Sequence, residues 1–294
     1  MSVCTLCPRK CGVDREIMRG YCQSGGKMHI ARAKLHYWEE PPISGTRGSG
    51  TIFFTGCSLR CAFCQNSEIS GGSLHGKDFT VEEFIETIKK LEAMGAHNIN
   101  LVTPTHFASQ IAEALRIYKP RVPVVYNCGG YESVETLRML EGLVDIYLPD
   151  FKYLNTDHAK KYSMAEDYPE IAKAALAEMV RQTGEPVFDE RGMMKRGVIV
   201  RHLLLPGCLA DGKRVVKYLH ETYGNRIYMS LMSQYTPLES LDAVKYPELN
   251  RKVPEYAYEK LVDYAISLGV MQAFIQEGDT AKESFIPPFT LEGV

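Results

Sequence analysis

The chain has 294 residues, with 34 lysine or arginine residues against 36 aspartate or glutamate residues and a formal net charge of -2. This balance offers no basic surface to nucleic acids or anionic membranes, and no apolar run approaches the roughly 20 residues of a membrane span. The start, MSVCTLCPRKCGVDR, also lacks the apolar segment of a signal peptide, so we expect a cytoplasmic protein with one main domain.

Residues 1–49 predict an irregular N-terminal lobe, because glycine, proline and cysteine are frequent and no apolar periodicity persists. Seven of the nine cysteines precede residue 65, and this crowding, the odd total and a cytoplasmic location favour metal-binding thiols over disulfides. The lobe contributes four of them, Cys4, Cys7, Cys11 and Cys22. Four thiolates suit one tetrahedral zinc or iron or a closed [4Fe-4S] cluster, and unligated or redox-paired thiols are the alternative.

From residue 51 onward, short apolar runs alternate with amphipathic segments. Residues 51–56, TIFFTG, predict a buried strand, and residues 80–95 predict a helix that starts at a capping box of Thr80 and Glu83 and stops at Gly95. The further predicted strands are residues 98–104, 122–128, 144–151, 197–207 and 226–235, and the further predicted helices are residues 106–119, 132–142, 168–184 and 254–269. A short apolar run, residues 271–276, follows. Such alternation predicts parallel strands in a barrel, a partial barrel or an open doubly wound sheet.

Each of the six predicted strands ends in a polar cluster. The clusters read TGCSLRC, TPTH, YNCGG, PDFK, RHLLLPG and SQY. Because parallel α/β folds assemble their sites at the carboxyl ends of the strands, we expect these six loops to converge on one pocket. The segment HYWEEPPISG, residues 36–45, could close that pocket around something small and polar.

The stretch CSLRCAFC carries three closely spaced cysteines, Cys57, Cys61 and Cys64, and no fourth cysteine lies nearby. Three thiolates on a four-iron cubane leave one iron open to an outside ligand, which indicates chemistry at the cluster. A zinc knuckle with a distant fourth ligand is the alternative. The spacing, the aromatic Phe63 before the last cysteine and the preceding strand closely resemble the radical S-adenosylmethionine superfamily over about residues 51–234. GCSLRCAFCQN, DFK and LPG look most like the branch that contains the pyruvate formate-lyase activating enzyme.

The resemblance implies a partial (β/α)6 TIM-type barrel over residues 50–294 with a C-terminal helical extension. It also implies that Cys57, Cys61 and Cys64 hold a [4Fe-4S] cluster whose open iron is chelated by S-adenosyl-L-methionine (SAM). One electron, from a reductant such as flavodoxin or ferredoxin, would then cleave SAM to methionine and a 5'-deoxyadenosyl radical that abstracts hydrogen from the substrate. An auxiliary cluster in the N-terminal lobe could relay electrons, whereas zinc would only fix the lobe over the barrel.

The resemblance further implies contacts to the cofactor near Phe63 and in the loop after the second strand. Family members usually carry a Gly-Gly-Glu type motif there for the methionine amino group, whereas this chain has VTPTH. Thr103, Thr105 or backbone carbonyls would then accept the ammonium hydrogens. His106 is either an acid or base for the substrate or a satisfied residue at a helix start.

Later loops supply the remaining predicted contacts. Asn127 in YNCGG can hydrogen-bond to ribose or carboxylate, and Asp150 and Lys152 in PDFK match a loop that can also hold a monovalent cation or form only an ion pair at the rim. Strand alternation lets one of Arg201 and His202 face inward, and we choose Arg201 for its permanent charge. Met232 is expected in the adenine wall, with core packing as the alternative.

Three functions remain open. The first is a protein-modifying radical enzyme, such as an activase of a glycyl radical enzyme, which the loop signatures favour. The second is a radical enzyme that acts on a small molecule or nucleotide, which HYWEEPPISG and TPTH favour. The third is a non-catalytic iron-sulfur scaffold or electron carrier, which an open three-cysteine site disfavours.

Overall fold

A computed structural model describes residues 3–71, 75–239, 241–276 and 289–294. Its centre is a sheet of seven parallel strands, ordered β10-β9-β8-β6-β5-β4-β2. These strands are β2 (Ser49–Phe54), β4 (Ile99–Val102), β5 (Val124–Cys128), β6 (Ile146–Pro149), β8 (Met194–Leu203), β9 (Tyr228–Met232) and β10 (Ala273–Ile275). Over the described residues the sheet does not close on itself, so the predicted partial barrel is confirmed, with β10 as a seventh parallel strand beyond the six predicted.

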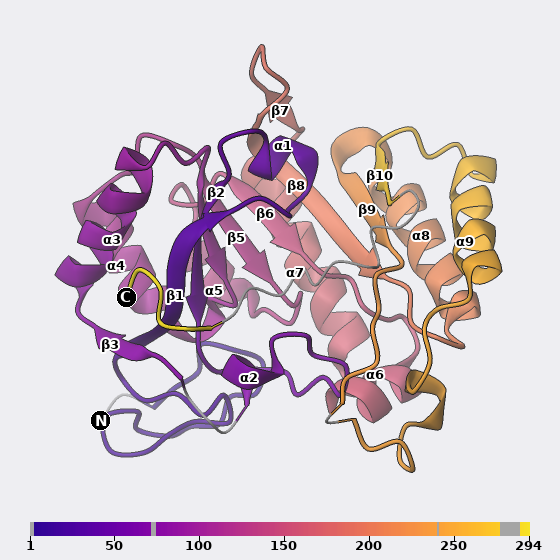
Figure 1. Ribbon diagram of the computed structural model, residues 1–294, viewed down its shortest axis with the longest axis horizontal. Coiled ribbons are helices and arrows are strands. Elements are labelled where there is room, and N and C mark those ends of the chain that lie inside the picture. The colour runs from indigo at the N-terminus through magenta and orange to yellow at the C-terminus, as the bar shows by residue number, and fades with distance from the viewer. Residues whose placement is uncertain (1–2, 72–74, 240, 277–288) are drawn as a thin grey trace.

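Helices follow the parallel strands and cover the sheet on the outside (Figure 1). The longer ones are α3 (Val81–Ala93), α4 (Ala108–Ile117), α7 (Tyr168–Thr183), α8 (Leu209–Tyr223) and α9 (Glu255–Ser267). Both halves of the predicted capping box are present at the start of α3, where Thr80 accepts from the amide of Glu83 and Glu83 accepts from the amide of Thr80. The shorter helical segments are α1 (Pro41–Ser44), α2 (Ser67–Ser70), η1 (Thr105–Phe107), α5 (Val134–Met139), α6 (Thr156–Ser163), η2 (Gly224–Arg226) and η3 (Pro247–Leu249).

The amino-terminal 49 residues are more regular than predicted. They contain a nine-residue strand, β1 (Met28–His36), which pairs antiparallel with β2 and with the short β3 (Lys77–Phe79). β1 reads MHIARAKLH, and its charged residues obscure the apolar alternation, although Met28, Ile30 and Ala31 are buried. β3 was not predicted either, nor was β7 (Val187–Phe188), which forms a hairpin with the start of β8 that projects beyond the sheet (Figure 1).

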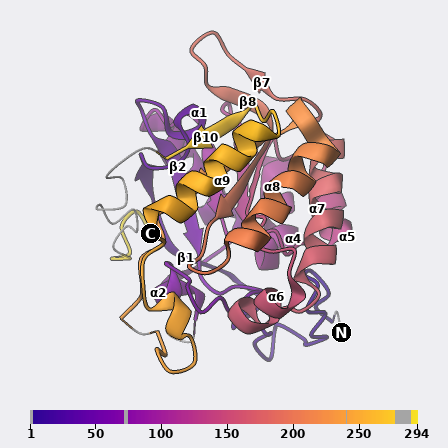
Figure 2. The same cartoon turned by 90° about the vertical axis from the view of Figure 1, so that its right-hand side faces the viewer.

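The core fills the space between the sheet and the helices on its outer side. Helices α7, α8 and α9 lie along one side of the molecule (Figure 2). The strands β2, β4, β5 and β6 are buried at every position, as expected for parallel strands packed on both faces. Among the described residues, no helix is both long and apolar enough to cross a lipid bilayer.

Candidate functional site

A cavity of about 790 Å³ lies inside the open barrel, within the size range of ligand pockets. Its wall contains most of the predicted site residues, namely Cys57, Cys61, Phe63, Cys64, Thr103, Asn127, Asp150, Lys152, Arg201 and Met232. They come from the loops after β2, β4 and β6 and from the strands β5, β8 and β9. The predicted convergence of the strand ends on one pocket therefore agrees with the geometry of the chain.

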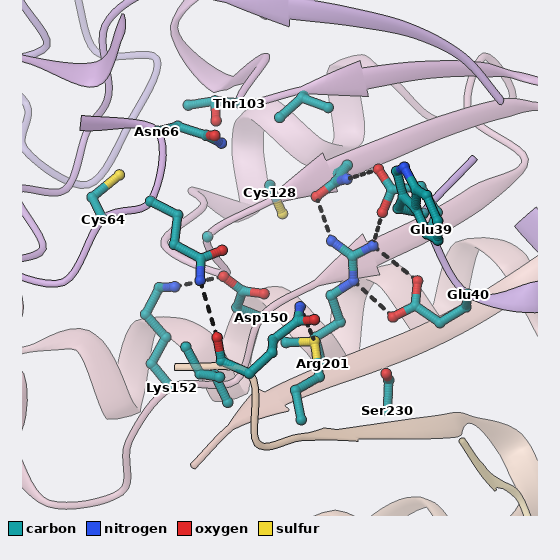
Figure 3. Close-up of a pocket in the computed structure, with 18 of the residues that line it drawn as sticks. Glu39, Glu40, Cys64, Asn66, Thr103, Cys128, Asp150, Lys152, Arg201 and Ser230 are labelled. Atoms are coloured by element: carbon teal, nitrogen blue, oxygen red, sulfur yellow. Dashed lines mark hydrogen bonds and ion pairs between the residues drawn. The ribbon is translucent and has the colours of Figure 1, made fainter. Parts of the chain in front are cut away.

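The three cysteines of CSLRCAFC lie on a loop after β2 at the edge of this cavity, and Figure 3 shows Cys64 there. The Cys61 and Cys64 sulfurs lie 3.0 Å and 3.3 Å from the hydroxyls of Ser163 and Ser70. Burial, together with the neighbouring thiols of Cys61 and Cys64, raises the pKa of Cys57. The protein without a cluster therefore keeps this thiol protonated, and metal binding must release the proton.

The donor set fits a cubane cluster, because three thiols face one cavity and none is in a disulfide. In the part of the chain that the structure describes, no three histidine, cysteine, aspartate or glutamate side chains converge as ligands of a single ion. A cubane does not require such convergence, since each cysteine binds a different iron.

Lys152 and Asp150 form an ion pair inside the cavity after β6, with 2.5 Å between the Lys152 Nζ and the Asp150 Oδ2 (Figure 3). Burial alone would lower the pKa of Lys152, but Asp150 and then Cys61 outweigh it and raise that pKa. The Lys152 ammonium also lies 5.6 Å from the centre of the Phe63 ring. The ion pair of Lys152 and Asp150 therefore lies next to the cysteine loop.

Thr103 has a positive φ of 59°, which is rare for a residue with a branched Cβ. Its amide donates to the Asn127 carbonyl at 2.8 Å, so β5 holds it in this conformation at the cavity wall. Such strain is concentrated at ligand sites in proteins.

The structure does not bring His106 and Thr105 to the cavity, because the chain turns into η1 directly after Pro104. The His106 Nε2 lies 2.7 Å from the Thr55 carbonyl, and burial lowers the pKa of His106 to about 3. Thr105 is also buried and donates to Glu132 at 2.9 Å. The His106 Nδ1 has no hydrogen-bond partner among the described residues, so the side chain is only partly satisfied. Neither His106 nor Thr105 lines the cavity.

Arg201 faces the cavity, whereas His202 points into the core and lies 2.8 Å from the Phe151 carbonyl through its Nδ1. The guanidinium of Arg201 is bound by two carboxylates, Glu39 and Glu40, from the segment HYWEEPPISG that was expected to close the pocket (Figure 3). Their pairing with Arg201 was not expected. The Arg201 Nε and Nη2 each donate to Glu40 at 2.8 Å. Most of the Arg201 donors predicted to contact the cofactor therefore already have partners within the protein.

A family model described as the Radical SAM superfamily matches residues 51–207. The chain belongs to the radical SAM superfamily. Membership implies an enzyme of radical chemistry that uses a [4Fe-4S] cluster and SAM. An uncharacterized protein of Methanocaldococcus jannaschii is 30% identical to this radical SAM protein over 271 residues, which are 89% of this chain and 74% of that relative.

Solved structures share the fold of this radical SAM protein. HydG, a maturase of the [FeFe]-hydrogenase, is 17% identical with a TM-score of 0.52 over 77% of this chain and 51% of its own. SuiB of Streptococcus suis, solved with S-adenosylmethionine, is 10% identical with a TM-score of 0.51 over 76% of this chain and 49% of its own. The chain thus spans about half the length of these two structures.

The N-terminal cysteines of this radical SAM protein lie beside the cysteine loop. The Cys57 amide donates to the Cys22 carbonyl at 3.3 Å, and the Arg9 Nε donates to the Ser58 carbonyl at 2.8 Å. Burial, together with the neighbouring Cys22, Glu132 and Cys4, raises the pKa of Cys7 to about 12. The N-terminal lobe therefore packs directly on the loop that carries Cys57, Cys61 and Cys64.

Proposed function

We propose that this protein cleaves SAM reductively at a [4Fe-4S] cluster held by Cys57, Cys61 and Cys64. When bound, the cluster supplies the electron that splits SAM into methionine and a 5'-deoxyadenosyl radical. The observation that carries the proposal is the placement of the three thiols at the edge of a cavity of about 790 Å³. Such a cavity offers room beside the cysteine loop for a cofactor and keeps bulk water from a radical.

The surrounding residues take separate roles in this proposal. Lys152 and Asp150 fix charge beside the cysteine loop, and Phe63 and Met232 supply apolar wall. Thr103 offers a neutral oxygen where the family's usual carboxylate motif is absent, and Asn127 on β5 contacts the ribose or carboxylate of the cofactor in this proposal. Asp150 and Asn127 already have partners in Lys152 and Arg201, so the proposal includes no monovalent cation.

Cleavage of SAM tests the proposal directly. Protein reconstituted with iron and sulfide without oxygen, and reduced with dithionite, should form 5'-deoxyadenosine and methionine. Cys61→Ala should abolish the products and the part of the cluster spectrum that responds to SAM, whereas Cys208→Ala, which changes a buried cysteine outside the cavity, should retain both. Full cleavage by Cys61→Ala would refute the assignment.

The proposed function has two versions, which differ in the class of substrate: a protein or a small molecule. Activation of a glycyl radical enzyme is supported by the loop signatures GCSLRCAFCQN, DFK and LPG. A small-molecule substrate is supported by Glu39 and Glu40, which lie on the segment after β1 and bind Arg201 across the cavity. The small-molecule version agrees better with the structure, because the segment that carries Glu39 and Glu40 forms part of the cavity wall. Flavodoxin or ferredoxin is the proposed reductant in both versions.

We also propose that residues 1–49 hold a second metal centre at Cys4, Cys7, Cys11 and Cys22. A closed [4Fe-4S] cluster fits better than zinc, because no three of the described histidine, cysteine, aspartate or glutamate side chains converge on a single ion. The contact between Cys22 and Cys57 supports a cluster that passes electrons to the catalytic site. Changing Cys7 and Cys11 together to alanine should lower the bound iron or zinc while the spectrum of the catalytic cluster still responds to SAM. Unchanged metal content would contradict the second centre.

A further inference from the structure

We propose that the cavity wall formed by Trp38, Glu39 and Glu40, hereafter the acidic wall, binds a positively charged ammonium group of the substrate. This inference rests on the proposed function, because it names the substrate class of the same cavity. Figure 3 shows Cys64 on one side of the cavity and Glu39 and Glu40 on the other, with Asp150 and Arg201 between them. The acidic wall is thus separated from the cysteine loop where SAM would bind.

The first step of the argument is an excess of negative charge. Three acidic side chains line the cavity, Glu39, Glu40 and Asp150, against the two basic side chains Lys152 and Arg201. Lys152 pairs with Asp150, so Arg201 alone faces both glutamates. The side chains of Glu39 and Glu40 are only 9% and 6% exposed. A buried net charge is costly unless it is paired, which favours a cationic ligand.

The guanidinium of Arg201 keeps the Glu40 carboxyl ionised. Burial opposes ionisation, but the Arg201 guanidinium outweighs it and holds the pKa of Glu40 below the ordinary value. Both guanidinium nitrogens that face Glu40 donate to it, so one carboxylate neutralises Arg201. Glu39 then carries the excess charge, supported by the amides of Asn100 at 2.9 Å and Asn127 at 3.3 Å.

A second observation points to a hydrogen-bond donor as the ligand. Asn100 is fully buried, and its Oδ1 has no hydrogen-bond partner among the residues that the structure describes. The same side chain donates to Glu39 through its Nδ2, so an unused acceptor lies directly behind the acidic wall, although Asn100 does not itself line the cavity. An ammonium group only donates hydrogen bonds, whereas a carboxylate or phosphate would only add acceptors.

Trp38 adds an aromatic surface next to the carboxylates. It lines the cavity and directly precedes Glu39 in the chain. The face of an indole attracts cations more strongly than other aromatic rings do, and carboxylates beside it strengthen that attraction. Trp38 is also the one tryptophan of the chain, so its fluorescence reports on this cavity.

The experiment uses the full-length reconstituted protein without oxygen and three probes of similar size, butylammonium, butanol and butyrate, at constant ionic strength. Butylammonium should change the Trp38 emission in a saturable way, and butanol and butyrate should bind at least about tenfold more weakly. Glu39→Gln should weaken butylammonium binding about tenfold or more, while Glu86→Gln on the exposed face of α3 should not. If the unaltered protein binds butanol as tightly as butylammonium, the proposal is overturned, and no variant is needed for that result.

The ammonium could also belong to SAM itself, and a second titration separates the two sources. If Glu39→Gln binds SAM within twofold of the parent and SAM does not compete with butylammonium, the acidic wall serves the substrate. If the variant loses SAM affinity tenfold and SAM displaces butylammonium, the assignment to the substrate is overturned. Cys61→Ala should retain butylammonium binding even where it loses SAM cleavage, so failure of the proposed function is distinguishable.

Discussion

The two cations of the cavity, Lys152 and Arg201, are each held by carboxylates, yet they differ in what they leave for a ligand. Lys152 has one carboxylate partner, Asp150, and lies near the cysteine loop. Arg201 has two, Glu39 and Glu40, and most of its donors are used. The charges available to SAM are therefore those of Lys152 and Asp150. A substitution of Asp150 alone should change how SAM binds.

Asp150→Asn should weaken SAM binding about ten- to a hundredfold. The substitution leaves the Lys152 ammonium in the cavity without its partner, and loss of a hydrogen bond to a charged group costs about 1.5 to 3 kcal/mol. The iron content should stay at the parent level because the cysteine ligands lie on another loop. Titration of the reconstituted protein with SAM measures the change.

Asp263→Asn is the matched control for that substitution. It makes the same chemical change on an exposed position of α9, outside the cavity, and should leave SAM binding unaltered. SAM affinity of Asp150→Asn within twofold of the parent would assign Asp150 to the substrate or to the rim.

At the level of elements, the junction between the N-terminal lobe and the end of β2 positions the cysteine loop. Gly56 follows β2 with a φ of +82° and packs tightly against the lobe. A Cβ at this position would lie 2.4 Å from both the Cys22 carbonyl oxygen and the Ser24 hydroxyl. The lobe and the cysteine loop can approach this closely only because residue 56 has no side chain.

Gly56→Ala should therefore displace the lobe and expose it to limited trypsin digestion, with a lower content of bound iron. Gly95→Ala is the control, because Gly95 has a similar φ of +86° but nothing within 4 Å of an added Cβ. The control should lose only the roughly 1 to 2 kcal/mol of backbone strain in its free energy of unfolding. Equal digestion rates for the two variants would show that the lobe contact is unimportant.

For the whole molecule, a buried carboxyl couples stability to pH. Burial raises the pKa of Glu132 to about 7, although Thr105 and Tyr126 donate to it at 2.9 Å and 3.0 Å and lower that pKa in part. The folded chain therefore keeps a proton that the unfolded chain releases near pH 4.5. The resulting stabilisation is complete below that pH and is lost as the pH rises through about 7.

Between pH 5.5 and 8, Glu132 should account for a loss of about 2 kcal/mol in the free energy of unfolding. Glu132→Gln should remove this part of the pH dependence, whereas Glu135→Gln on the exposed side of α5 should preserve it. Denaturant unfolding of the parent and both variants at the two pH values measures the difference. An unchanged slope in Glu132→Gln would mean that the carboxyl is ionised in the folded protein.

The sequence by itself determined the fold class and the cysteine loop. Buried parallel strands have continuous apolar runs, and the amphipathic helix at Val81–Ala93 carries its own capping box, so local chemistry was sufficient for these elements. The cysteine spacing of CSLRCAFC is equally local. β1 escaped prediction because the pairing of its charged residues with β2 is a long-range contact.

Only the tertiary structure decided which polar residues share the cavity. His106 and Thr103 are three residues apart in the chain, yet η1 turns His106 into the core while β5 holds Thr103 at the cavity wall. Glu40 and Glu39 lie 161 and 162 residues from Arg201 in the sequence. HYWEEPPISG was expected to close the pocket, but no local pattern predicts that its two carboxylates pair with an arginine on β8. Charge pairing depends on distance in space, and for these residues the fold alone sets that distance.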